Sequence, residues 1–128
     1  MNNSKIFSDL EQNQTYQLES ALQTLFINIH SIPGKKAIFT NARINNYFIG
    51  KLDFNLGINE FTTILVAAIK DYPVSRRNPN HPLIKLADYI INQPLQKYNL
   101  DDENIEIFTQ ISSLGHKKLE AFTTNTYE

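Results

Sequence analysis

Apolar residues recur every three to four positions along this chain, and this spacing restricts what the chain can fold into. The clearest run begins at Phe61 and ends at Tyr72, where Pro73 stops it. Its apolar positions are Phe61, Ile64, Leu65, Ala68, Ile69 and Tyr72. Residues at this spacing lie on one face of an α-helix, whereas a half-buried strand alternates with a period of two. The run therefore predicts an amphipathic helix.

Shorter segments repeat the same helical spacing, and no long alternating run competes with them. The segments are residues 18–29, 35–42, 47–52, 83–91 and 105–111. Helices of this length are marginal alone and depend on packing against one another. We therefore expect an all-α fold, a compact bundle of five to six short helices.

Capping and helix-breaking residues indicate where these helices begin and end. Thr15 is a candidate N-cap for the first helix, and Gly57 or Asn59 for the helix over residues 61–72. Pro82 suits a first helical turn, where a missing N–H costs nothing. Gly115 is a natural helix end. These signals predict a last helix that stops near residue 115.

The two ends of the chain are more polar than its middle. We expect residues 1–14 to form a polar N-terminal segment with at most a short helix. Residues 15–114 would form the helical domain, and residues 115–128 a C-terminal tail or linker. The length of 128 residues is close to that of one ordinary domain.

Composition excludes several classes of partner and compartment. There is no cysteine, and the formal net charge is −1 with scattered Lys and Arg. Disulfides and thiolate metal sites are thereby excluded, and the basic stripe typical of nucleic-acid binders is absent. No apolar stretch is long enough to cross a bilayer. We expect a cytoplasmic protein with neither nucleic acid nor membrane as its partner.

The sequence offers little for catalysis or metal binding. His30, His81 and His116 are far apart and form no paired helical motif, so we expect no metal and no cofactor. His81 precedes Pro82 and is expected to support a helix start. Asp53 is interpreted as the cap of a turn rather than as a general base. There is no nucleophile elbow and no phosphate-binding loop, so we predict no enzyme activity.

Residues 35–111 resemble the helical effector-associated domains of bacterial conflict and signalling proteins. The expected basic pair is Lys35-Lys36, Leu52-Asp53-Phe54 matches a Leu-Asp-Leu step, and Tyr72 ends the helix that follows. Two apolar helices then complete the pattern. Arg43 departs from it, because Ala42-Arg43-Ile44 stands where the family has Ala-Gly-Leu.

The resemblance implies a death-fold-like adaptor module without an active site. Such a domain couples a sensor or regulator to an effector in bacterial signalling or defence, by like-to-like association with a similar helical domain, its own copies included. From polarity we predict that the partner-binding residues are Lys35, Lys36, Arg43, Arg76, Arg77 and Asp102.

Two alternatives stay open from the residues alone. One is a small helical enzyme or ligand-binding protein whose pocket between helices uses Asp53, His81 or a tyrosine. The other is a helix-turn-helix regulator that binds nucleic acid, which the near-neutral charge disfavours.

Overall fold

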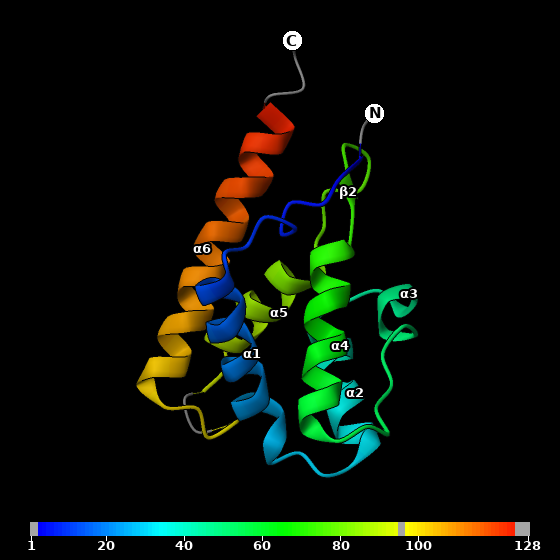
Figure 1. Cartoon of the computed structure of the whole chain (residues 1–128), viewed down its shortest axis with the longest axis vertical. Helices are drawn as coiled ribbons and strands as arrows, with labels where there is room; N and C mark the ends of the chain where they lie inside the picture. Colours follow the sequence, from blue (N-terminus) through cyan, green and yellow to red (C-terminus); the bar gives the residue numbers. More distant parts are fainter. Residues whose placement is uncertain (1–2, 95–96, 125–128) are drawn as a thin grey trace.

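The computed structural model describes residues 3–94 and 97–124, and within these ranges it confirms an all-α compact bundle (Figure 1). The helices are α1 (Gln12–Ile27), α2 (Ile32–Asn41), α3 (Asn46–Ile49), α4 (Ile58–Asp71), α5 (Pro82–Ile91) and α6 (Asp102–Thr124). Two short strands, β1 (Asn3–Ser4) and β2 (Val74–Ser75), pair antiparallel. No described helix is both long and apolar enough to cross a membrane.

The core forms where the apolar faces of four helices meet. α5 packs against α6, and α1 packs against both α4 and α6. Stacked and edge-on aromatic rings tie α1, α2 and α4 together: Phe26 lies 5.5 Å from Phe39 and 5.2 Å from Phe61, centroid to centroid. Such geometries add to the gain from burying apolar area. The predicted apolar face of α4 is confirmed at Phe61, Leu65 and Ile69, which are all buried.

The segment before α1 contributes directly to this core. Ile6 and Phe7 are buried, and Phe7 has no exposed surface. Residues 3–11 contain no helix, and they run from β2 past the end of α4 to the side of α6 (Figure 1). How the chain divides into domains stays a prediction.

Two of the predicted helix starts are confirmed and one is wrong. Gly57 is the N-cap residue of α4. Pro82 occupies the first turn of α5, and the side chain of His81 caps that helix. α1, however, is capped by Glu11 rather than by Thr15, which lies inside the helix. The Glu11 side chain and the Gln14 side chain each accept the other residue's backbone N–H, so a capping box starts α1 one turn earlier.

The predicted helix end at Gly115 is also wrong, because α6 continues to Thr124. Residues 115–124 are therefore helical rather than tail, while residues 125–128 of the expected tail lie outside the described residues. A Cβ on Gly115 would stand 2.6 Å from Cγ1 of Ile84 and 3.1 Å from Cζ of Phe7. Gly115 thus permits close packing of α6 on α5 rather than stopping the helix.

Candidate functional site

A serine, a histidine and an aspartate meet between α5 and α6, but not in the order that hydrolysis requires. Ser112 Oγ donates to Asp88 Oδ1, and His116 Nε2 lies 2.9 Å from Asp88 Oδ2. In a hydrolytic triad the histidine stands between the serine and the acid, where it takes the serine proton. Here the acid is central: Ser112 donates directly to the Asp88 carboxylate, and among the described residues no histidine hydrogen-bonds to Ser112. The cluster fastens α5 to α6, and sequence spacing alone did not reveal it.

His81 is buried and fully hydrogen-bonded. Its Nδ1 accepts the Leu83 backbone N–H at 3.0 Å, so its Nε2 carries the proton and donates to the Ile69 carbonyl at 3.1 Å. Burial lowers the pKa of His81 to about 4, although the bond to Ile69 opposes this shift. The neutral ring joins α4 to α5, and the prediction that His81 supports a helix start is confirmed.

The predicted turn role of Asp53 is confirmed. Its Oδ1 accepts the Asn55 backbone N–H at 3.0 Å, and the residue is exposed between buried Leu52 and Phe54. The cavity nearest His81 measures only about 80 Å³. Ligand pockets usually measure several hundred Å³. In the parts of the chain that the structure describes, no three His, Asp or Glu residues are placed to hold a metal ion.

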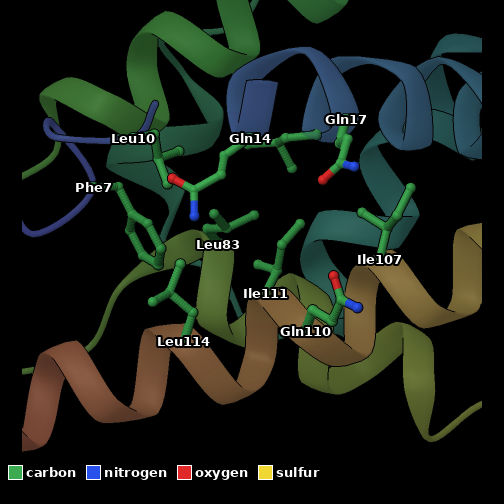
Figure 2. A pocket seen from close by; sticks show the side chains of 10 residues that line it. Phe7, Leu10, Gln14, Gln17, Leu83, Ile107, Gln110, Ile111 and Leu114 are labelled. Carbon is green, nitrogen blue, oxygen red and sulfur yellow. The ribbon is translucent and has the colours of Figure 1, made fainter. Parts of the chain in front are cut away.

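A cavity between α1 and α6 is mainly apolar (Figure 2). Figure 2 shows Gln14 and Gln17 from α1, and Gln110 and Ile111 from α6, converging on it. Its volume of about 90 Å³ is too small for an ordinary metabolite. Leu83 and Phe7 line its inner end, so the cavity is a packing gap between elements of the core.

The predicted basic pair lies on the first half of α2, against aromatic rings. Lys35 Nζ is 5.6 Å from the ring centroid of Phe61, and Lys36 Nζ is 5.6 Å from that of Phe54. A lysine at this distance gains a modest cation–π attraction while its ammonium stays hydrated. The pair covers the edge of the aromatic core and still presents two positive charges.

Arg43 follows α2 in the left-handed conformation, with a φ of 63°. Its N–H donates to the Thr40 carbonyl and that of Ile44 to the Phe39 carbonyl, both at 3.0 Å. These two bonds make a Schellman motif, whose left-handed residue is usually glycine. The departure from Ala-Gly-Leu is thus a change of side chain at a position that keeps the glycine conformation.

A shallow depression adjoins Arg43 and brings together basic and tyrosine side chains. Its volume is about 350 Å³, and Asn41, Arg43, Lys85 and Tyr89 are among its lining residues. Lys85 Nζ donates to the Arg43 carbonyl at 3.1 Å. We call this surface the basic depression. The sequence predictions missed Lys85, although the apolar spacing of residues 83–91 already placed it on the polar face of that helix.

Lys97 and two tyrosines extend this surface. The hydroxyls of Tyr89 and Tyr98 lie 2.7 Å apart, and Lys97 Nζ is 5.7 Å from the ring centroid of Tyr89. Burial raises the pKa of Tyr89, but hydrogen bonds with Tyr98, Lys97 and Asn41 outweigh it and leave the pKa below its ordinary value. Burial and the bond to Tyr89 raise the pKa of Tyr98.

The six predicted docking residues do not form one surface. Arg76 and Arg77 follow β2 at the end of the molecule where β1 and β2 lie, and Asp102 opens α6 at the opposite end (Figure 1). Lys35, Lys36 and Arg43 belong to α2 and its C-terminal end. All six except Lys35 are exposed. Whether they bind a partner stays a prediction.

A second depression, of about 410 Å³, lies between α1 and the first turns of α6. Tyr16, Gln17, Glu103 and Glu106 are among its lining residues, and no lysine or arginine lines it. Tyr16 is 71 % exposed. We call this surface the acidic face. The sequence predictions missed Tyr16, although an aromatic residue on the polar side of α1 was visible in the apolar spacing.

The fold and these surfaces define an all-α domain whose exposed features are charged faces and an aromatic side chain. A family model described as effector-associated domain 8 matches residues 12–124. The chain belongs to this family, which confirms the resemblance seen over residues 35–111 and extends it in both directions. Searches of curated proteins and of solved structures found no match.

Proposed function

We propose that this chain is a non-catalytic adaptor domain that couples a sensor or regulator to an effector in bacterial signalling or defence. The observation that carries the proposal is its membership of the effector-associated domain 8 family, which spans most of the chain. The small apolar cavity between α1 and α6 and the Asp88-centred cluster are in keeping with it, because neither offers a substrate site with an activated nucleophile. The adaptor would act in the cytoplasm.

Its mechanism would be like-to-like association of helical domains through charged faces with a few apolar or aromatic anchors. Interfaces of this kind combine a polar rim with a small central set of residues that supplies most of the binding energy. Complementary charge sets the partner and the encounter rate more than the affinity. The predicted partner residues Lys35, Lys36, Arg43, Arg76, Arg77 and Asp102 are the candidates on this chain.

The test uses effector-associated domains encoded beside this chain's gene as soluble binding partners for the immobilised chain. We expect at least one of them, or the chain itself, to bind, and biolayer interferometry measures the affinity. Charge reversal of the loop pair, Arg76→Glu with Arg77→Glu, should weaken that binding at least tenfold, whereas Arg→Lys at both positions should preserve it. The helical circular-dichroism signal should not change in either variant.

Two results would count against the proposal. If none of these domains nor a second copy binds at about 1 mM, the weak end of specific association, the adaptor function fails. If binding survives the double charge reversal, the loop after β2 is not the docking surface, and the substitutions move to Lys35 and Lys36 as a matched pair.

A further inference from the structure

We infer that a second copy of this chain docks head to tail, with the acidic face of one copy seated on the basic depression of the next. The inference rests on the proposed like-to-like association and names the two surfaces that would meet. Both surfaces are present on every copy and share no lining residue. Each copy can therefore contact two others.

The basic depression supplies positive charge around a recess. Arg43 is exposed, and the bond from Lys85 Nζ to the Arg43 carbonyl places the second cation directly beside it. The depression contains one carboxylate, that of Asp88, against the two cations of Arg43 and Lys85. The net charge of its lining is therefore positive.

The acidic face supplies the opposite charge around an exposed aromatic ring. Tyr16 stands largely in solvent, with Glu103 and Glu106 lining the same depression from α6. Among the described residues, no ion pair engages either glutamate. Tyrosine is enriched among the residues that dominate binding energy, because it buries a large area at low entropic cost.

Charge favours the pairing of these two surfaces. With Tyr16 lying on the shallow depression, the glutamates beside it would face Arg43 and Lys85. A two-fold symmetric dimer would either place a surface against its own copy, where juxtaposed like charges are unfavourable, or pair the two surfaces reciprocally and stop at two copies. Head-to-tail contacts close into a ring or extend into a filament.

The experiment uses the whole chain and two variants, each with one surface disabled. The basic variant carries Arg43→Ala and Lys85→Ala, and the acidic variant carries Glu103→Gln and Glu106→Gln. Sedimentation velocity at low salt measures the mass over a range of concentrations. We expect the unaltered chain to grow in mass with concentration beyond the mass of a dimer, and each variant alone to associate at least tenfold more weakly. Circular dichroism checks that both variants are folded.

Mixing the two variants is the decisive step. The intact acidic face of the basic variant should bind the intact depression of the acidic variant, giving a 1:1 complex that cannot extend. Tyr16→Ala added to the basic variant should abolish that complex. A matched control with Lys51→Ala and Lys117→Ala removes two exposed lysines outside both surfaces and should leave self-association unchanged.

Three outcomes would overturn the inference. They are an unaltered chain that stays monomeric at about 1 mM, variants that associate as the unaltered chain does, or a mixture that forms no 1:1 complex. Binding to the neighbouring effector-associated domains is measured separately. A monomeric chain that still binds one of them refutes the head-to-tail contact and leaves the adaptor function standing, whereas loss of both refutes the two proposals together.

Discussion

At the scale of single residues, His81 makes stability depend on pH. Its pKa is about 4 in the folded chain, against an ordinary value of 6.5, because burial disfavours the imidazolium. Between these two values the unfolded chain binds more protons than the folded chain, so protonation favours unfolding. The free energy of unfolding is therefore fully retained above pH 6.5 and falls as the pH drops toward 4.

We predict a loss of about 2 kcal/mol between pH 7.5 and pH 5, a window that lies above the titration of ordinary carboxylates. Urea unfolding followed by circular dichroism at several pH values measures it. The variant His81→Asn should unfold with a much flatter pH dependence, whereas the exposed His30→Asn should behave like the unaltered chain. A flat profile for the unaltered chain would contradict the assignment.

At Arg43 the sequence showed a departure from the family pattern but not the backbone conformation of that residue. Ala42-Arg43-Ile44 lacks the expected glycine, yet Arg43 adopts a φ of 63°. The left-handed conformation costs an ordinary residue about 1–2 kcal/mol, a cost that glycine would not incur. The greater conformational freedom of glycine in the unfolded chain would offset part of the stability gained by removing this cost. The backbone conformation of Arg43 is set by the hydrogen bonds that close the end of α2, and the identity of the residue alone does not reveal those bonds.

We predict that Arg43→Gly raises the free energy of unfolding by about 0.5–1 kcal/mol. Arg43→Ala is the matched control, because it removes the guanidinium and keeps the Cβ that causes the strain. Chemical denaturation of both variants measures the difference. A glycine variant less stable than the alanine variant would show that Arg43 is not strained. Because both lack the cation, both should also associate more weakly under the head-to-tail arrangement.

At the scale of elements, the helical spacing predicted helix positions well and helix ends less well. The apolar face of α4 followed the periodicity, because burial on one side is what that pattern records. The predicted helix end at Gly115 was wrong, because glycine ends many helices but also permits two helices to approach closely. Only the position of Ile84, thirty-one residues earlier in the chain, distinguishes the two uses.

We predict that Gly115→Ala destabilises the fold by up to about 2 kcal/mol. Overpacking against Ile84 costs about 1–3 kcal/mol, and the better helix propensity of alanine returns about 1 kcal/mol. Thermal unfolding by calorimetry measures the change. Gly57→Ala is the control for an added Cβ that meets nothing within 4 Å, and as a change at the N-cap of α4 it should cost no more than about 0.5–1 kcal/mol. A stabilised Gly115→Ala variant would mean that the helix crossing is looser than described.

The contact of α5 with α6 offers a second prediction at this scale. Ser112 is buried and donates to Asp88, while Ser113 beside it on α6 is exposed. Ser112→Ala should cost about 1–2 kcal/mol, since it removes a hydrogen bond from a buried hydroxyl to a charged carboxylate. Ser113→Ala should change stability by less than about 0.5 kcal/mol. Equal effects in urea unfolding would show that the cluster does not fasten the two helices.

At the scale of the whole molecule, the sequence predicted which segments are helical but not which of them meet. The charged residues chosen from polarity lie on α2, after β2 and at the start of α6, because polarity reports exposure and not proximity. Lys85 and Tyr16 were passed over for a related reason. The role proposed for them depends on neighbours from elsewhere in the chain, Arg43 for the lysine and Glu103 and Glu106 for the tyrosine.

The N-terminal segment gives the last prediction, on which the family match and the structure differ. The match begins at residue 12, yet Phe7 is fully buried and its ring lies 4.7 Å from that of His81. Truncating a buried phenylalanine costs about 3–5 kcal/mol, so Phe7→Ala should lower the free energy of unfolding by that amount. Deleting residues 1–10 should cost at least as much, because Ile6 and the pairing of β1 with β2 are lost as well.

Urea unfolding of both variants measures the loss, and Ile27→Ala, which truncates an exposed apolar residue, is the matched control. Its effect should stay below about 0.5 kcal/mol. If the deletion left the stability unchanged, the folded unit would begin at α1, and the buried state of Phe7 would contribute nothing to it. If stability falls as expected, the unit that folds, and that must be used in every binding experiment above, includes the residues before the family match.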